Sequence, residues 1–555
     1  MGFGLINFEF KKWKSSIDWK LLILLLLFLN VKLVIKIPAI VFVYLLDPNL
    51  KFGFRLKNSR LPLFYPLIAG IAGLGFFFNQ AYQNPAYLLV FFTGLVFWML
   101  CLLAIHQVKR SIELQEPAII HRTLCLFFVI NALFSILNLT FIIGETGTIN
   151  PYLYQGHYQK YFMGTGDYIK GITFDTSTTN AILNAIGVLY FLSKKNYLML
   201  LTCMFVLLLT ASNFVNIILL LILAMLFIFK STRNQKSTIV ICVLMLAVFM
   251  FRVSPQNNKY VSENFKQLFT KAKTRPGINP KTVMLPIAQR PDSALDLEER
   301  KEKTAILFLD SLNKIELLAE SKKPAQQIPA HLLKDEEGRI LLPKDDINSP
   351  SFQSIKVPLP AQQPIIRFIT ENSAFLPLST QKERALKLPG KVISLSQSFN
   401  FLRQNPIKLI LGNGMGNFSS KLAFRTTKLG IAGSYPGPRY IHSDFMQNHL
   451  DLYLLFFSQQ SGYHSLTNNP FSVYDELLLE YGVIGLLAFL IYYVGYFVKH
   501  HRKLSYGIPI LLLLLSIFFV DYWYEQLSVV IVFELILLLD IKESTLKMIE
   551  RTEHE

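Results

Sequence analysis

The segment VYDELLLEYGVIGLLAFLIYYVGYFV, residues 473–498, starts with polar residues and continues as an apolar run. A membrane-spanning helix needs about 20 such residues, so this segment is predicted to cross a bilayer. The long polar segment 253–472, which contains the glycine-rich stretch LILGNGMGN at 409–417, leads directly into it. Because irregular backbone near lipid must be covered by protein or water, this junction predicts a reaction or binding site at the membrane surface.

Apolar segments of this kind recur along the chain. The 555 residues are 52% hydrophobic, with a mean hydropathy of +0.38, which places the chain in the membrane class. Helices are predicted near residues 19–33, 35–47, 61–78, 87–106, 118–143, 174–193, 197–211, 213–230, 237–252, 473–498, 506–522 and 525–541. The first pair, and the seventh and eighth, could each be one kinked helix. We therefore expect an all-α integral membrane protein with about twelve spans.

The distribution of basic residues predicts the orientation. The formal net charge is +18. With twelve spans, the basic clusters fall on one side: Lys11 to Lys14, Lys51 to Arg60, Lys109–Arg110, Lys194–Lys195, Lys230 to Lys236 and Lys499 to Lys503. The positive-inside rule makes that side cytoplasmic, with both termini. Segment 253–472 is then extracytoplasmic; its basic excess is no objection, since long loops translocate largely regardless of charge.

Composition divides the chain into five parts. We predict N-terminal membrane helices in 1–252 (about nine), a Pro/Lys-rich insert in 253–390, an ordered extracytoplasmic lobe in 391–472, C-terminal membrane helices in 473–541 (about three) and a cytoplasmic tail in 542–555. The insert has few aromatic residues and can bury little core. Nucleic acid is not an expected partner, because the charge is split between short loops and one long loop rather than gathered on a basic domain.

Cationic side chains of the lobe are candidates for binding a diphosphate. Arginine offers a bidentate fork and lysine a point charge to phosphate oxygens. The candidates are Lys391, Arg425, Lys428 and Arg439, and the alternative is that each is simply solvated. Arg439 is the strongest, because Pro436, Gly437 and Pro438 predict a turn that holds its guanidinium in place.

Histidines and one glutamate are candidates for proton transfer. His442, His449 and His464 have the side chain whose pKa lies nearest neutral pH, although lone histidines are more often surface or packing residues. Glu480 lies deeper in the re-entering helix. Burial of a carboxylate there is costly, so its presence indicates a functional role. His442, His464 and Glu480 are therefore predicted as catalytic candidates together with Arg439.

Three further residues are predicted to bind substrate. Gly414 lies in a tight turn, 412–417, where backbone can approach a ligand closely. Asn469 and Tyr474 lie at the start of the re-entering helix. No HExxH motif, Cys/His spacing or clustered Asp pair marks the lobe, so neither a metal nor another cofactor is expected.

Several motifs together resemble the O-antigen ligase and O-antigen polymerase superfamily of bacterial membrane proteins. The resemblance covers most of the chain in span number and loop order, and the motifs that carry it are Gly171–Asp175 running to Asn180, Thr210–Ser212, Pro406 with Leu411–Gly414, and Glu480–Gly485. It implies a GT-C-like helical fold in the inner membrane. It also implies a metal-independent glycosyltransferase whose donor is a polyprenyl-diphosphate-linked saccharide on the periplasmic side. Membrane lipid and other polysaccharide-assembly proteins would be partners.

Two departures from the family pattern bear on the reaction. Phe471–Ser472 occupy the position where ligases of the family carry a His-Asn pair, and Lys391 replaces an arginine. His464 with Asn468 and Asn469 could substitute for the missing pair. The missing His-Asn pair favours a polymerase of repeat units of a surface polysaccharide, O-antigen or exopolysaccharide. The alternatives are a ligase that transfers a finished glycan to a lipid or protein acceptor, and, in another class, a polysaccharide transporter or flippase.

Overall fold

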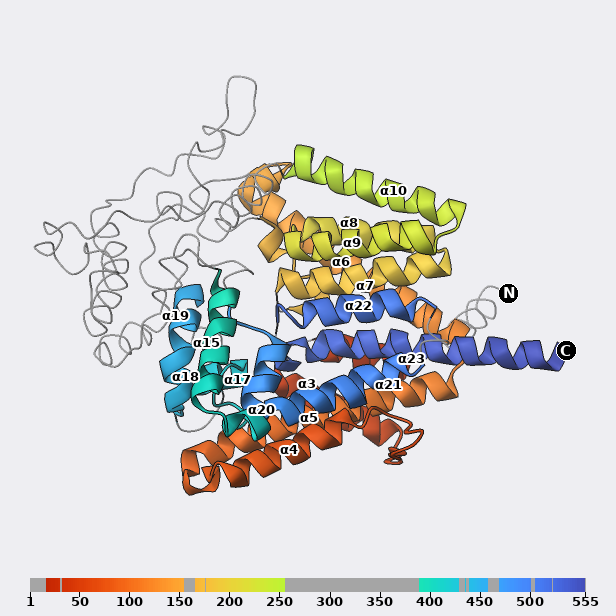
Figure 1. Cartoon of the computed structure of the whole chain (residues 1–555). Coiled ribbons are helices and arrows are strands. Elements are labelled where there is room, and N and C mark those ends of the chain that lie inside the picture. The colour runs from red at the N-terminus through yellow and green to blue at the C-terminus, as the bar shows by residue number, and fades with distance from the viewer. Residues whose placement is uncertain are drawn as a thin grey trace, which may run out of the picture.

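The protein is an α-helical bundle with a smaller helical lobe at one end (Figure 1). The structure is a computed structural model, and it describes residues 16–29, 32–153, 165–174, 176–254, 389–428, 435, 439–457, 469–500, 505–521 and 523–554. Most of the predicted insert, residues 255–388, lies outside the described residues. Every regular element within the described ranges is helical.

The bundle consists of α2 (Trp19–Phe28), α3 (Leu33–Leu46), α4 (Phe64–Phe78), α5 (Pro85–Leu114), α6 (Pro117–Thr146), α7 (Ser177–Lys194), α8 (Tyr197–Leu209), α9 (Asn213–Phe229), α10 (Arg233–Val248) continued by η5 (Phe249–Val253), α20 (Val473–Phe489) continued by η10 (Leu490–Val494) and α21 (Gly495–Val498), α22 (Gly507–Ile517) and α23 (Trp523–His554). The lobe consists of α15 (Gly390–Gln404), α16 (Lys408–Leu411), α17 (Lys421–Thr426), α18 (Ser443–Asn448) and α19 (Leu450–Phe457). Short turns η1 (Ala81–Gln83), η2 (Pro151–Leu153), η3 (Thr165–Tyr168) and η4 (Gly171–Thr173) lie between bundle helices.

Four bundle helices are long and apolar enough to cross a membrane: Pro85–Leu114, Pro117–Thr146, Arg233–Val253 and Val473–Val498. Six further apolar helices are shorter. A helix lies at each position where the sequence predicts one. The prediction of an all-α membrane protein is thus confirmed in its coarser form, an all-helical chain with several helices that could span a bilayer.

The two ambiguous pairs are each two helices. Lys20, at the start of α2, forms an ion pair with Asp47, just after α3, at 3.0 Å. This pairing shows that α2 and α3 form a hairpin whose two ends meet. Between α8 and α9, Ala211 adopts a left-handed backbone with φ of 51°, which breaks the helix and starts a turn.

Side-chain bonds connect the basic inter-helix loops at one end of the bundle, which we call the basic end. Arg110 pairs with Asp47, Arg60 with Glu113, Lys194 with Glu543, Lys499 with Asn58, and Lys230 with the Ser505 carbonyl. The described loops that the positive-inside rule assigns to one side therefore do lie together, whereas Lys11 to Lys14 lie outside the described residues. The lobe lies at the opposite end, beside the start of α5 and of α20 (Figure 1).

Aromatic side chains fill the bundle beneath the lobe. Trp98 of α5 donates from its indole N–H to the Tyr481 hydroxyl of α20 at 2.8 Å, and both side chains are fully buried. Phe64 of α4 packs edge-on against Trp98 and Phe489. Large rings bury much apolar area, and the polar atoms of Trp and Tyr satisfy each other here. This packing fixes α20 against α4 and α5, and thereby positions the site.

Candidate functional site

The glycine-rich turn 412–417 is held against α20 by the carboxylate of Glu480. One oxygen, Oε1, accepts backbone N–H bonds from Phe418, Ser419 and Ser420 at 3.1, 3.0 and 2.9 Å. The other, Oε2, accepts from the Gly416 N–H at 2.5 Å. Glu480 is 1% exposed, so backbone donors replace the water that the charge has lost. This geometry gives Glu480 a positioning role, and its predicted role in proton transfer stays a prediction.

Direct backbone contact joins the same turn to a kink in α20. The Asn413 N–H donates to the Leu479 carbonyl at 2.8 Å, and the Gly414 N–H donates to the Glu480 carbonyl at 3.1 Å. Gly482, with φ of 71°, interrupts the helical backbone there. A Cβ on Gly482 would lie 2.2 Å from the Ile410 carbonyl oxygen, so only glycine allows this approach.

A polar pocket with a volume of about 480 Å³ opens beside this turn. Its walls come from the α4–α5 connection and from the lobe, and they comprise Asn79, Gln80, Ala81, Gln83, Asn84, Pro85, Tyr87, Lys408, Asn417, Tyr440 and His442. Tyr87 donates to the Met415 carbonyl at 2.8 Å, and Tyr440 donates to the Asn417 side chain at 2.8 Å. These bonds join the two walls to the glycine-rich turn. We call this space the lobe pocket.

The lobe pocket offers positive charge and hydrogen-bond donors. No acidic residue is among the described residues that line it. Lys408 donates to the Asn79 side chain at 2.5 Å. Burial lowers the pKa of Lys408, and nearby Asp444 opposes that effect. A cation surrounded by amides and tyrosine hydroxyls can bind an anionic group together with a polyhydroxylated one.

His442 presents its Nε2 atom as a donor. Its Nδ1 accepts from the Asp444 backbone N–H at 3.1 Å and lies 3.4 Å from the Asn413 side-chain amide. In the neutral ring the proton must then be on Nε2, because Nδ1 is the acceptor. Burial is the main cause that lowers the pKa of His442, and Lys408 adds to it while Asp444 opposes it. A neutral ring with this tautomer suits hydrogen bonding to an anionic oxygen better than the predicted role of general base.

Two of the predicted substrate-binding residues bond to each other beneath the lobe, outside the pocket. The Lys391 ammonium donates to the Asn469 side chain at 2.9 Å and to the carbonyls of Phe471 and Val520. Lys391 is 8% exposed, and its burial lowers its pKa from 10.5 to about 7, against the opposing effect of Asp521 and Asp475. Since an ammonium has three donors, Lys391 joins the lobe to the ends of α20 and α22.

The remaining predicted residues lie around the lobe. Arg425 has its guanidinium 5.3 Å from the centre of the Tyr435 ring, a cation–π contact. Arg439 is exposed and donates to the Thr427 carbonyl at 2.9 Å, whereas most of the turn predicted around it lies outside the described residues. Tyr474 donates to the Leu515 carbonyl at 2.7 Å. His464 lies outside the described ranges. Of the nine predicted residues, His442 lines the lobe pocket, and Gly414 lies in the turn beside it.

A buried cluster around His449 lies below the pocket. The Ser394 hydroxyl lies 2.8 Å from His449 Nε2, and Asp475 Oδ2 lies 3.2 Å from the same nitrogen. Serine and aspartate thus contact one ring atom rather than opposite sides of the ring, so this cluster is not a nucleophile-activating relay. It joins α15 to α20, which agrees with the expectation that a lone histidine more often has a packing role.

Sequence reasoning missed Asn79, Asn84, Tyr87 and Lys408. The sequence signals for these residues were local. Asn84 precedes Pro85, as a helix N-cap does, and it caps α5 by accepting from the Ala86 N–H at 3.0 Å. Lys408 directly precedes the glycine-rich stretch. Neither signal indicates that the two segments meet.

Comparisons with protein-family models, curated proteins and solved structures find no match to this chain, so the site must be interpreted from its own residues.

Proposed function

We propose that this protein is a membrane glycosyltransferase that polymerises polyprenyl-diphosphate-linked oligosaccharide repeat units of a surface polysaccharide. The observation that carries the proposal is the lobe pocket, a polar space free of acidic lining residues in the described chain, with Lys408 and His442 on its wall. It opens at the end of the bundle opposite the basic loops. A lipid-linked donor there could keep its polyprenyl chain in the bilayer while its diphosphate and sugars enter the pocket.

The amide side chains on the wall suit recognition of sugar. Asn79, Gln80, Gln83 and Asn84 all come from the α4–α5 connection. Each amide offers donors and an acceptor, which matches the hydroxyl groups of a saccharide. Tyr87 and Tyr440 are themselves buried, and their bonds to Met415 and Asn417 fix the pocket wall in place. Asn469 and Tyr474, predicted to bind substrate, make protein contacts instead.

In the proposed reaction, the hydroxyl oxygen of an acceptor sugar forms a bond to the donor's anomeric carbon. The bond from that carbon to the diphosphate oxygen breaks, and the polyprenyl diphosphate leaves with the electron pair. The Lys408 ammonium and the His442 Nε2–H stabilise the negative charge that develops on this oxygen. The hydroxyl proton goes to a base. His464 stays the prediction for that base, and Arg439 stays a prediction for holding the diphosphate.

Deletion of the gene in the protein's own host tests the reaction class, with surface and lipid-linked glycans separated by size. Single repeat units on the lipid carrier are expected for a polymerase. Long lipid-linked chains that fail to reach their final acceptor would assign the protein as a ligase. Unchanged glycans would contradict both enzymes and favour the transporter.

Complementation with variants tests the pocket. Lys408→Gln removes the cation and retains most of the side-chain length, and His442→Phe removes the Nε2 donor. Each is expected to lower polymer formation about 100-fold or more, since the loss of one donor that stabilises charge in the transition state typically costs about 100- to 1,000-fold in rate. Lys57→Gln, an exposed change at the basic end, is the matched control. Full polymer from Lys408→Gln, with protein levels equal to the control, would contradict the proposed site.

A further inference from the structure

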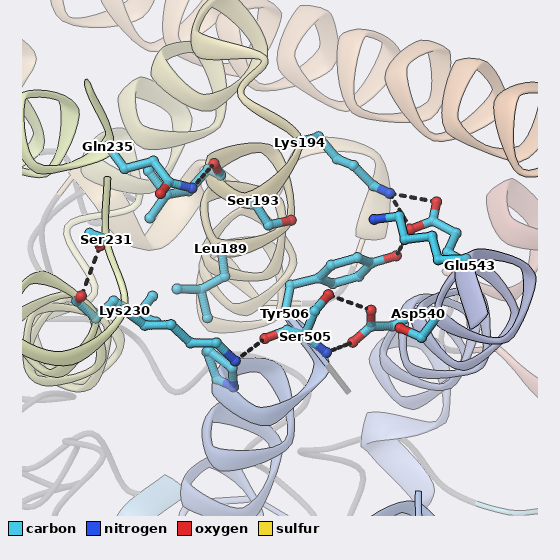
Figure 2. Close-up of a pocket in the computed structure, with 15 residues that line it drawn as sticks. Leu189, Ser193, Lys194, Lys230, Ser231, Gln235, Ser505, Tyr506, Asp540 and Glu543 are labelled. Carbon is cyan, nitrogen blue, oxygen red and sulfur yellow. Dashed lines mark hydrogen bonds and ion pairs between the residues drawn. The ribbon is translucent and has the colours of Figure 1, made fainter. Parts of the chain in front are cut away.

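A second pocket, with a volume of about 260 Å³, lies at the basic end of the bundle (Figure 2). It is formed between α7, α9, α10, α22 and α23, and the set of side chains that line it includes Lys194, Lys230 and Lys547. Three lysines are in this set, and the reaction proposed at the lobe pocket uses none of them. We call this space the basic-end pocket.

The two carboxylates of the basic-end pocket are already bonded to the protein. Asp540 accepts from the backbone N–H groups of Ser505 and Gly507, each at 2.7 Å, and from the Ser505 hydroxyl. It therefore caps the N-terminus of α22, where a negative charge is favourable. Glu543 is paired with Lys194 and accepts from the Tyr506 hydroxyl at 3.1 Å. The charge of Glu543 is thus balanced by Lys194, and the charge of Asp540 is stabilised by the backbone N–H groups at the start of α22.

The lysines on the exposed side of the pocket are less constrained. Lys230 is exposed, and its ammonium donates to the Ser505 carbonyl at 3.1 Å, across the pocket from Lys194 (Figure 2). An ammonium has three donors, so this carbonyl uses one of them. Lys547 is also exposed and lies one turn beyond Glu543 on α23. Positive charge therefore exceeds negative charge around the opening.

Apolar residues form the other wall. Leu189 and Leu192 come from α7, and Leu226 and Pro509 come from the apolar helices α9 and α22 of the bundle. A cavity with a cationic opening and an apolar wall, between helices at the end that the positive-inside rule makes cytoplasmic, has the chemistry of a site for an anionic lipid headgroup. A phosphate without an acyl chain would use the lysines but gain nothing from the leucines.

We infer that the basic-end pocket binds the phosphate group of an anionic phospholipid, with Lys230 and Lys547 as its cationic contacts and the leucine wall against the upper acyl chain. The proposal does not depend on the reaction at the lobe pocket. Bound lipid would connect α9 to α22 and α23, and the Lys230 bond to the Ser505 carbonyl already joins the end of α9 to the start of α22.

The test uses purified full-length protein in neutral detergent, titrated with short-chain phosphatidylglycerol, short-chain phosphatidylcholine and inorganic phosphate. Binding is measured by native mass spectrometry and by the melting temperature. Phosphatidylglycerol is expected to bind, and the double variant Lys230→Gln/Lys547→Gln to bind it about thirtyfold more weakly, since each lysine near a lipid surface contributes about 1 kcal/mol. Lys230→Arg/Lys547→Arg should retain binding.

The matched control is Lys51→Gln/Lys57→Gln, which removes the same charge from exposed positions at the same end of the bundle. If inorganic phosphate alone raises the melting temperature of the wild type but not that of the pocket variant, the phosphate site is supported and its occupant is a soluble ligand. Equal binding of phosphatidylcholine, or equal loss of phosphatidylglycerol binding in the pocket and control variants, would overturn the proposal.

Discussion

Substitution of Glu480 by glutamine is expected to loosen the glycine-rich turn. The amide oxygen can keep the three N–H bonds from Phe418, Ser419 and Ser420, but the amide nitrogen then faces the Gly416 N–H, so that two donors oppose each other. A hydrogen bond to a charged group contributes about 1.5–3 kcal/mol, and the three retained bonds weaken when the charge is lost. Removal of a buried charge offsets part of this loss. We expect a net destabilisation of about 2–3 kcal/mol.

The assay is thermal unfolding of the purified full-length protein in detergent. Glu113→Gln serves as the control, because Glu113 pairs with Arg60 near the surface and such pairs contribute about 0–1 kcal/mol. Both variants lose one carboxylate charge. Glu480→Gln should melt at a clearly lower temperature than Glu113→Gln, and it should also lower polymer formation, since Asn417 of the turn lines the lobe pocket. Equal melting temperatures would refute the assigned role of Glu480.

Two other substitutions test the junction between lobe and bundle. Gly482→Ala should prevent stable folding or lower the melting temperature sharply, because the added Cβ would lie 2.2 Å from the Ile410 carbonyl oxygen. The control Gly73→Ala adds an atom with nothing within 4 Å and should be neutral or stabilising. Similar melting temperatures of the two variants would contradict the close approach of Gly482 to Ile410. Lys391→Met tests how the stability of the protein depends on pH. The folded chain releases the Lys391 proton near pH 7 and the unfolded chain releases it near pH 10.5. Over that interval the unfolded state binds more protons, so the stability of the wild type should rise relative to that of the variant. Parallel melting curves from pH 7 to about 10 would show that Lys391 does not titrate in this way.

Apolar runs were sufficient to predict the helices of the bundle. Each predicted span contains a helix, although runs such as 35–47 and 197–211 are shorter than a full membrane span, because an apolar segment in a membrane can satisfy its backbone only within a helix. The sequence left open whether α2 and α3 are one kinked helix or two helices of a hairpin. The answer depends on contacts between residues distant in sequence, such as the ion pair of Lys20 with Asp47. The basic clusters indicated that their loops share one end, and the side-chain bonds there agree.

The site was only partly predictable for the same reason. The glycine run at 412–417 was identified as a tight turn, but the partner that required it, the Gly482 kink, lies 70 residues from Gly412 in the chain and reads as an ordinary helix position. Lys391 was identified by its charge, yet its burial against Asn469 depends on how α15 packs. Lys408 and Asn84 meet in the pocket through tertiary structure alone.

The place of α23 in the bundle has a consequence for how the protein is made. This helix packs against α2, α5, α6, α7 and α22, and Lys542 donates to the Ile112 and Gln115 carbonyls at the end of α5. A ribosome adds residues in order, so α5 enters the membrane several hundred residues before its partner exists. Until α23 arrives, surfaces of early helices must be covered by lipid or by the insertion machinery, and completion of the bundle waits for the synthesis of α23.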